Sequence, residues 1–436
     1  MMHRKLLVAA LAAAALNAFA AAPNWFDQAV DSEYDGMVQT RVALHQMPEL
    51  GNQEYKTQAF IIDYLKKAGV DKVIKGYKNS PTAVIGIINP GKGSTIGLRS
   101  DIDGLPVKEN TGLPFASVNK GKMWGSDTFT AHMCGHDAHM TMLLTAAKIL
   151  AQHKADIPRE VVLVFQPAEE GNSLENPMKV ENSKNSGAKA LVADGLIEEF
   201  KIERMFGIHV DPMGKPGQLE LVSGAVMNSG DSFEIHLTGK AAHGALPWMG
   251  VDAALMTAQT VVELQQIVSR NVNLAKGLGI VTVGKMSAGD TVNVMTGTGY
   301  ILGTVRTNNS DIQKLILKRI NEIANGVAAA YGGTATTRIV NAYPVLYNDP
   351  KLAGRTIKNL KDFGLDIISS TRNAGASEDF AHYADKVPSS FMFLCVGTPG
   401  QPIAAPHSDK FIVNDEALKS GVKAHIAAAL GDFDNL

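Results

Sequence analysis

Cysteine and excess charge are both scarce in this sequence. The chain of 436 residues has two cysteines, Cys134 and Cys395, and a formal net charge of −2 at pH 7. Two cysteines can form at most one disulfide, so the chain has no disulfide framework. Because basic residues are not in excess, the sequence lacks the electrostatic footprint of a nucleic-acid-binding protein, and we expect no nucleic-acid partner.

Long hydrophobic runs are missing beyond the N-terminus. No later stretch reaches the length that crosses a bilayer, so we expect no membrane association of the mature protein. The N-terminus has positive residues at 3–5, a short apolar run and the small-residue pattern AFA at 18–20. This pattern is typical of a secretory signal peptide rather than of a short buried helix. We therefore expect a signal peptide over 1–22, cleaved near Ala20–Ala22, and an exported protein in a bacterial periplasm.

Internal repeats and low-complexity linkers are absent as well, and the length suits two domains. Short, almost continuous apolar runs of strand length lie at 83–89, 95–101, 161–170, 205–210 and 391–398. Amphipathic helical patterns lie between them, at 55–69, 139–153 and 188–200. This alternation predicts an α/β domain with a mostly parallel sheet flanked by helices.

The middle of the chain has a different order of elements. Residues 231–343 show strand, helix, strand, strand, helix and strand patterns in turn, an order that suits a small ferredoxin-like α+β sandwich. We therefore expect a discontinuous catalytic domain, formed by 23–222 and 346–436, with an inserted satellite domain at 223–345.

Acidic and imidazole side chains stand at the ends of three predicted strands. They are Asp101 and Asp103, Glu169 and Glu170, and His209. In open α/β sheets, ligands bind beyond the carboxyl ends of the strands. We expect these five side chains to lie close together at that edge.

The segment TFTAHMCGHDAHM, at 129–141, adds Cys134 and His136, which are separated by one residue. A thiolate and an imidazole at this spacing suit a turn around zinc or a similar divalent ion. The alternative is a nucleophilic cysteine with a histidine base, in which the start of a helix lowers the pKa of the thiol. These two residues alone leave both hypotheses open.

The adjacent carboxylates Glu169 and Glu170 favour the metal hypothesis. Neighbouring carboxylates at a strand end repel each other unless a cation or a proton neutralises them. Beside a metal ion, one can bind the ion while the other takes a proton from water. A cysteine hydrolase has no evident use for the pair. His209 and His407 add little to the metal hypothesis by themselves, because a single histidine on an apolar strand is more often a core residue.

Eight motifs, taken together, carry a resemblance to a known family. They are LHQMPELGNQE (44–54), LRSDIDGLPVKENTGLPFAS (98–117), CGHDAH, FQPAEEG, GIHV, GKAAHGALP (239–247), SEDFA (377–381) and HSDKFIVNDEAL (407–418). In order and spacing they resemble metallopeptidase family twenty, in its amidohydrolase branch of aminoacylases, hippurate hydrolases and plant hydrolases of indole-acetyl amino acids. The resemblance covers nearly the whole chain after the predicted signal peptide.

The resemblance implies a centre of two divalent metal ions, with zinc or manganese favoured and cobalt or nickel as alternatives. The metal ligands that it implies are Cys134, His136, Glu170, His209 and His407. It also implies that Glu169 is the general base and acid and that Asp103 supports a ligand. Related branches place a metal ligand at the position of Asp101, so its role stays open.

In the satellite domain, His243 resembles the histidine that polarises the scissile carbonyl, often from a partner subunit. Asn293 and Arg306 match positions that contact substrate, and Arg306 suits a bidentate pair with a free carboxylate. The resemblance also implies a homodimer formed through the satellite, which would act as a lid and a dimerisation domain.

The sequence therefore predicts an exported metal-dependent amidohydrolase of N-acyl or N-aroyl amino acids that uses Glu169 to activate a metal-bound water. The alternatives are a carboxypeptidase or dipeptidase of short peptides, and a non-catalytic exported binding protein with the same fold. Three features depart from the family pattern: Met133 beside Cys134, Trp248 after Pro247, and the long polar loop at 172–186.

Overall fold

The computed structural model describes residues 22–179 and 186–433. The predicted signal peptide, 1–22, lies outside these residues except for Ala22, so its outcome stays a prediction. None of the described helices is long and apolar enough to cross a bilayer.

The chain forms two compact units. The first unit runs to Gly224 and takes in Asn348–Thr371 and the chain from His382 onward; the second comprises Ala225–Tyr347 and Arg372–Ala381. The segment Arg372–Ala381, which we assigned from the sequence to the C-terminal part of the catalytic domain, thus groups with the second unit.

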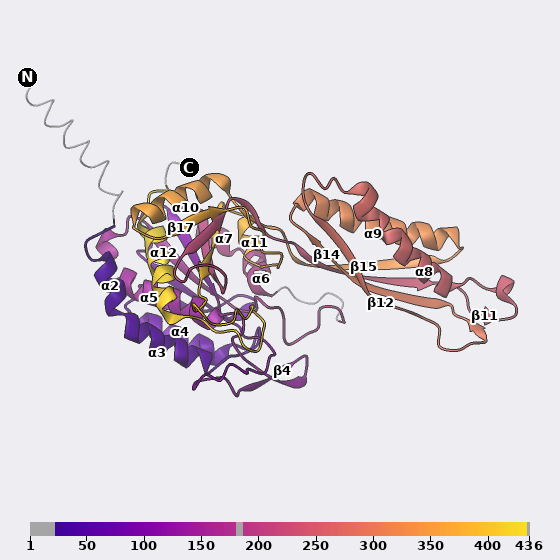
Figure 1. Cartoon of the computed structure of the whole chain (residues 1–436), viewed down its shortest axis with the longest axis horizontal. Helices are drawn as coiled ribbons and strands as arrows, with labels where there is room; N and C mark the ends of the chain where they lie inside the picture. Colours follow the sequence, from indigo (N-terminus) through magenta and orange to yellow (C-terminus); the bar gives the residue numbers. More distant parts are fainter. Residues whose placement is uncertain (1–21, 180–185, 434–436) are drawn as a thin grey trace, which may run out of the picture. The chain divides into compact units, whose positions relative to one another are not determined.

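The first unit contains the indigo, purple and yellow parts of the chain in Figure 1 and is built on an eight-stranded sheet in the order β1-β2-β6-β3-β7-β18-β8-β17. Its strands are β1 (Lys72–Tyr77), β2 (Ser80–Ile88), β3 (Thr95–Asp101), β6 (Glu160–Gln166), β7 (Arg204–Asp211), β8 (Leu219–Val222), β17 (Ile367–Ser370) and β18 (Ser389–Cys395). The central strands β6, β3, β7 and β18 run parallel, whereas β1 and β2 are antiparallel at one end. The predicted α/β fold with a mostly parallel sheet is confirmed.

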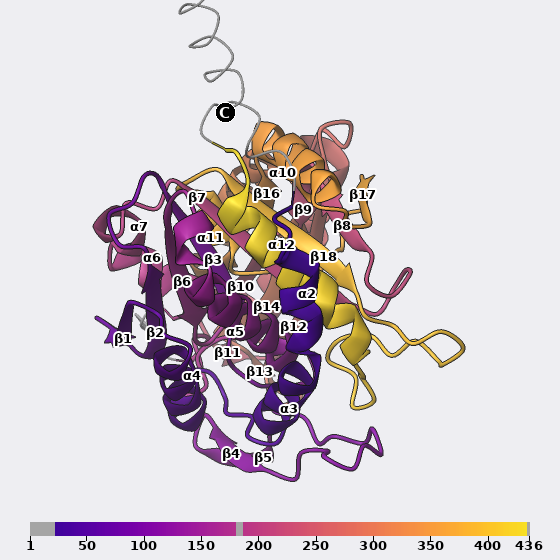
Figure 2. The same cartoon turned by 90° about the vertical axis from the view of Figure 1, so that its left-hand side faces the viewer.

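Helices flank this sheet. They are α2 (Phe26–Ser32), α3 (Tyr34–His45), α4 (Tyr55–Lys67), α5 (His136–Gln152), α6 (Gly187–Ala193), α7 (Leu196–Glu199), α10 (Pro350–Asp362) and α12 (Leu418–Leu430). One buried apolar cluster joins α5, α10 and α12 to β3, β7 and β18, and Figure 2 looks onto α12, drawn in yellow. Because the central strands are apolar on both faces, they pack between layers rather than facing water.

One predicted helix is wrong. The pattern at 188–200 forms two short helices, α6 and α7, and not one. Gly195, between them, has φ of 87°, in the left-handed region that ends a right-handed helix. The amphipathic pattern continues across this break, which is why the sequence did not reveal it.

The second unit is a four-stranded antiparallel sheet in the order β12-β14-β10-β15, with two helices. Its elements follow the chain as β10 (Gly230–Thr238), α8 (Ala253–Leu264), β12 (Gly279–Ala288), β14 (Thr298–Thr307), α9 (Ser310–Ala330) and β15 (Thr334–Tyr343). This is the predicted order of strands and helices. Phe233, Ile301 and Ile316 lie in its own apolar core, so this unit does not depend on the first for a core.

Short elements complete the description. They are β4 (Lys120–Met123), β5 (Ser126–Phe129), β9 (Gly224–Met227), β11 (Ala242–His243), β13 (Val294–Met295), β16 (Leu346–Asn348) and α11 (Ala381–Ala384). Helix α8 ends at Leu264 and is followed by a π-helical turn, Ile267–Asn271.

Candidate metal centre

The turn that opens α5 brings Cys134 and His136 together. Gly135, between them, has φ of 88°, and a Cβ atom there would lie 2.3 Å from Cγ2 of Val210. Only glycine fits this conformation at this distance from β7. The sharp turn places Cys134 just before the helix and His136 at its first residue, and both side chains are buried.

His136 is held by Asp103. Nδ1 of His136 lies 2.8 Å from the backbone oxygen of Asp103 and 3.2 Å from its Oδ1. The other ring nitrogen, Nε2, is buried and has no hydrogen-bond partner among the described residues. A buried polar atom without a partner is rare in proteins, and an imidazole fixed through one nitrogen presents the other to a metal ion.

Cys134 and His209 face each other. Sγ of Cys134 lies 3.4 Å from Nε2 of His209, while Nδ1 of His209 lies 2.7 Å from the backbone oxygen of Val210. Burial and the nearby carboxylate of Glu170 raise the pKa of the Cys134 thiol well above its usual range. Nucleophilic cysteines have the opposite surroundings, which lower the thiol pKa.

Glu169 and Glu170 follow β6 and point toward the same cluster. Asp103 Oδ2 accepts the backbone N–H of Glu170 at 3.0 Å, so Asp103 contacts both His136 and the acidic pair. Oε1 of Glu170 lies 3.9 Å from Nε2 of His136. The potential ligand atoms of His136, Glu169 and Glu170 all lie within 4.8 Å of one another.

His407 reaches the cluster from a loop far along the chain. Its backbone N–H donates to the oxygen of Met133 at 2.7 Å, which ties the loop to the turn that carries Cys134. Nε2 of His407 lies 3.1 Å from Oε1 of Glu170, and 55% of the side chain is exposed. His407 is thus the most accessible of the five predicted ligands.

The structure therefore brings the five predicted ligands and the predicted base into one cluster. Cys134, His136 and His209 form one group of potential ligands, and Cys134, Glu170 and His407 form another. The donor set of one thiol, three imidazoles and carboxylates suits zinc and related divalent ions. The unpartnered Nε2 of His136 and the buried negative charge around it both fit a bound cation.

Asp101, whose role the sequence left open, has both carboxylate oxygens engaged. Oδ1 lies 2.7 Å from Nδ1 of His139, and Oδ2 accepts from Arg99 at 2.7 Å. The other ring nitrogen of His139 accepts the backbone N–H of Val210 at 2.9 Å. Asp101 thus supports, through His139, the backbone beside His209.

Sequence reasoning missed the supporting roles of His139 and Arg99. His139 follows His136 by three residues, so the two lie on the same face of α5. Arg99 precedes Asp101 by two residues, so both side chains lie on the same face of β3. These spacings are signals that could have found the two residues.

A second buried network lies behind the ligand turn and was also missed. Asp137 accepts from Arg41 at 3.2 Å and lies 2.8 Å from Nδ1 of His45. Nε2 of His45 lies 3.1 Å from Glu109, and Arg41 also pairs with Asp415. Burial alone would lower the pKa of His45, but Asp137 and Glu109 raise it to about 9. This network ties α3 to the start of α5.

The predicted substrate residues belong to the second unit. His243 and Asn293 lie beside each other, because β11 pairs with β13 and the N–H of Gly244 donates to the oxygen of Asn293 at 2.8 Å. Both side chains are exposed. Arg306, on β14, donates to Thr304 Oγ1 at 2.6 Å. Among the described residues, no hydrogen bond or ion pair joins Arg306 to His243 or Asn293.

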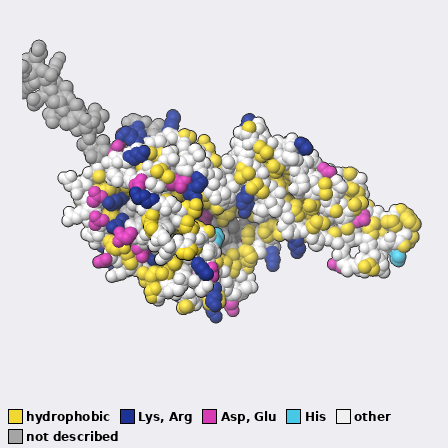
Figure 3. All heavy atoms as spheres, viewed as in Figure 1, with side chains coloured by type: hydrophobic (Ala, Val, Ile, Leu, Met, Phe, Trp, Pro, Cys, Tyr) yellow, Lys and Arg dark blue, Asp and Glu magenta, His cyan; other side chains and the backbone are white. Residues whose placement is uncertain are grey.

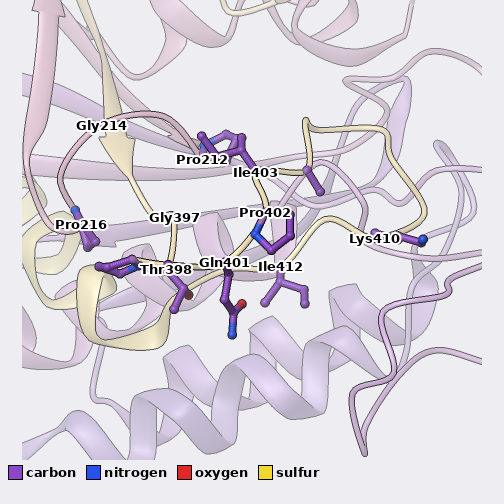
Figure 4. Close-up of a pocket in the computed structure, with 13 residues that line it drawn as sticks. Pro212, Gly214, Pro216, Gly397, Thr398, Gln401, Pro402, Ile403, Lys410 and Ile412 are labelled. Atoms are coloured by element: carbon purple, nitrogen blue, oxygen red, sulfur yellow. The ribbon is translucent and has the colours of Figure 1, made fainter.

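The first unit also has a pocket that is lined by other residues than those of the predicted site. Its volume is about 270 Å³, and it is enclosed by the loops 212–216 and 397–412 (Figure 4). Its walls are mainly proline and glycine with Gln401 and Lys410, and none of the predicted site residues lines it. We assign it no role in the chemistry.

Comparison with known families identifies the class of protein that this fold and donor set define. The profile described as Peptidase family M20/M25/M40 matches residues 97–430. The chain belongs to this family. It is a metal-dependent hydrolase of amide bonds, as the resemblance of its motifs predicted.

Three curated relatives show how far this similarity extends. The chain is 36% identical over 382 residues to the N-acetyl-L-cysteine deacetylase of Bacillus subtilis, which covers 88% of this chain and 84% of the relative. It is 33% identical to an N-acetyldiaminopimelate deacetylase of Streptococcus pneumoniae, over 89% of this chain and 96% of the relative. It is 30% identical to thermostable carboxypeptidase 1 of Saccharolobus solfataricus, over 91% and 95%.

Two solved structures share the fold over most of their length. A putative aminohydrolase from methicillin-resistant Staphylococcus aureus has a TM-score of 0.83 and 32% identity, with 93% of this chain and 98% of that chain covered. A dinuclear metal-binding peptidase of the M20 family from Bacillus subtilis has a TM-score of 0.74 and 26% identity, with 92% and 98% covered. Family membership, this dinuclear neighbour and the donor cluster agree on a cofactor of two divalent metal ions.

Proposed function

We propose that this protein is an exported amidohydrolase that removes the acyl or aroyl group from N-acyl or N-aroyl amino acids, as aminoacylases and hippurate hydrolases do. The observation that carries the proposal is the acidic pair at the end of β6. Glu169 and Glu170 offer carboxylate oxygens within 4.8 Å of a nitrogen of His136. One carboxylate is thus available to bind a metal ion while its neighbour handles a proton.

Each residue of the cluster has a proposed role. Cys134, His136, Glu170, His209 and His407 would hold the two metal ions. When bound, such ions supply Lewis acidity and lower the pKa of water. Glu169, which is buried, takes a proton from the attacking water on its carboxylate and returns it to the nitrogen of the leaving amine. Asp103 fixes the ring of His136 and the backbone of Glu170.

The second unit is proposed to bind the substrate. His243 has an exposed ring whose Nδ1 accepts the N–H of Ala245 at 3.1 Å, which leaves Nε2 free to donate to a carbonyl oxygen. Arg306 offers a guanidinium for the free carboxylate of an amino-acid product, and Asn293 adds an amide. Two relatives named as deacetylases of N-acetyl amino acids support this substrate class.

A homodimer formed through the second unit is also proposed. Strand β12 is at the edge of its sheet and exposes Ile280 and Met286, while α8 exposes Leu255 and Val262. Figure 3 shows many hydrophobic side chains on the surface of this unit. An unpaired edge strand with apolar neighbours is a surface that tends to pair with another chain. Export to the periplasm rests on the N-terminal sequence alone.

The alternative function is cleavage of short peptides. One relative is named as a carboxypeptidase, and a dipeptide presents the same free carboxylate and a similar amide bond. The third possibility from the sequence, a non-catalytic binding protein, is not supported, since the chain keeps Glu169 beside the complete donor cluster.

A substrate panel tests the proposal. The purified protein, supplied separately with zinc, manganese, cobalt or nickel, would be assayed for amine release from N-acetyl amino acids, hippurate, aminobenzoyl-glutamate and dipeptides. We expect kcat/KM for at least one acyl or aroyl amino acid to exceed that for every dipeptide. Higher kcat/KM for dipeptides would establish the peptidase alternative, and no turnover with any metal would contradict both.

A further inference from the structure

The acidic pair follows a strained backbone position. Ala168, directly before Glu169, has φ of 53°, in the left-handed region that non-glycine residues seldom adopt and in which they are strained. A turn of this kind persists only where its surroundings hold it. The direction in which Glu169 and Glu170 leave β6 therefore depends on whatever fixes Ala168.

The buried side chain of Glu54 contacts this turn. Its Oε1 accepts the backbone N–H of Ala168 at 2.8 Å, and its Oε2 accepts from Oγ1 of Thr82 at 2.8 Å. Glu54 is fully buried and stands directly before α4. The carboxyl group is therefore anchored between β2 and α4, with one oxygen on Thr82 and the other on the strained residue.

The neighbours of Glu54 hold the other end of the same turn. A Cβ atom on Gly51 would lie 2.2 Å from the backbone oxygen of Gly171, so the two backbones are in direct contact. The N–H of Ser173 donates to the oxygen of Gly51 at 3.3 Å, and Nε2 of Gln53 donates to Oγ of Ser173 at 2.6 Å. Residues 51–54 thus contact the turn 168–173 at both of its ends.

Glu54 is an unfavourable choice for stability alone. Burial and the negative charge of Asp103 raise the pKa of its carboxyl to about 8. A buried carboxyl group destabilises a fold unless its hydrogen bonds offset the loss of water. An apolar side chain would avoid that penalty but would leave the N–H of Ala168 and the hydroxyl of Thr82 without this acceptor, so the groups that Glu54 binds, and not packing, explain the residue.

We propose that Glu54 is a positioning residue that fixes the left-handed turn at Ala168 and thereby aims Glu169 and Glu170. This inference rests on the proposed roles of Glu169 as base and Glu170 as metal ligand. Without the hydrogen bond, the turn relaxes toward common backbone angles and both carboxylates leave their positions. A misplacement of about 1 Å in a catalytic group can lower a rate about 100-fold.

Three variants of the full chain test this role. Glu54→Leu removes the acceptor, Glu54→Gln keeps an oxygen that can accept the N–H of Ala168, and Glu49→Leu is the matched control. Glu49 belongs to the same segment, but its carboxylate accepts the N–H groups of Lys56 and Thr57 at 2.9 Å and so caps α4 instead. All three variants would be compared in kcat, KM and thermal stability.

We expect Glu54→Leu to lower kcat by about 10- to 100-fold, with KM changed by less than about twofold. Glu54→Gln should lose much less of the wild-type kcat. Glu49→Leu should lower thermal stability and leave kcat and KM unchanged. The visible spectrum of the cobalt-loaded protein gives a second readout, because Glu170 would shift as a ligand. We expect this spectrum to change in Glu54→Leu only.

An unchanged kcat and cobalt spectrum in folded Glu54→Leu would overturn the positioning role. If Glu54→Leu does not fold, Glu54→Asp takes its place, because its shorter side chain withdraws the oxygen from Ala168 while keeping a carboxyl group. Inactivity of the wild type toward every substrate would sink the proposed function instead, and the cobalt spectra would still decide whether Glu54 positions Glu170.

Discussion

The histidines of the two units differ in their burial and in the number of hydrogen bonds that fix their rings. In the first unit, His136 and His209 are buried, and each ring is fixed through Nδ1 by an oxygen atom. In the second unit, His243 is exposed, and its ring contacts only the backbone N–H of Ala245 among the described hydrogen bonds. The first unit thus presents a cluster with fixed geometry, and the second presents single polar groups on its surface.

This difference indicates a division of labour. Rigid, buried ligands suit metal binding and proton transfer, which need fixed distances. Exposed groups on short strands suit contact with a substrate that must enter and leave. We therefore expect substitutions in the first unit to change metal binding or kcat, and those in the second to change kcat or KM with the metal content intact.

The largest effect is expected for Glu169→Gln, which removes the base without changing the size of the side chain. We expect kcat to fall by about 10³-fold or more, since proton transfer by a positioned base contributes about 10²–10⁴-fold. Metal content, measured by elemental analysis, should stay at the wild-type value. A variant that keeps more than a tenth of wild-type kcat would remove Glu169 from the mechanism.

A smaller loss is expected for His243→Ala. We expect kcat to fall by about 10²–10³-fold, as for other groups that stabilise a developing oxyanion, with unchanged metal content. The control is His236→Ala, which removes an exposed histidine of the same unit that pairs with Glu234 instead. If both variants behave alike, His243 has no special role.

Arg306→Ala is expected to act mainly on KM. Loss of a charge-assisted pair with the substrate carboxylate should raise KM by about 10- to 100-fold. The same variant should differ little from wild type on a substrate whose carboxylate is amidated. An equal rise in KM for both substrates would show that Arg306 does not read the carboxylate.

The last prediction concerns stability and pH in the network behind the ligand turn. Asp137 and Glu109 raise the pKa of His45 to about 9 in the folded state, above the value of about 6.5 in an unfolded chain. The stabilisation is therefore complete below about pH 6.5 and is lost as the pH rises through about 9. Denaturant titrations at a series of pH values should show that the free energy of unfolding falls more between pH 6.5 and 9 in the wild type than in His45→Gln, by no more than about 3 kcal/mol. An equal fall in both proteins would contradict this.

Much of the fold of the first unit could be predicted from the sequence. Five strands can be recognised in the sequence as continuous apolar runs, because they are buried on both faces: β2, β3, β6, β7 and β18. Asp101, Glu169 and His209 could be placed together because parallel strands end at one edge of the sheet.

Other features depend on contacts that one sequence does not reveal. His139 and Glu54 act through single hydrogen bonds to backbone groups at Val210 and Ala168, 71 and 114 residues away along the chain. The split between α6 and α7 depends on one backbone angle at Gly195. In the second unit, the position of Arg306 in the sequence does not indicate a binding role, and only the family resemblance pointed to this residue.

The metal stoichiometry of matched variants tests the central claim most directly. The claim is that the ligand cluster of the first unit is a complete two-metal site. After chelation and titration with cobalt, we predict two ions per chain in the wild type, fewer in His136→Ala and Glu170→Ala, and two in His243→Ala and Arg306→Ala. A wild type that binds no cobalt, or a loss of metal in the second-unit variants equal to that in His136→Ala, would contradict the account.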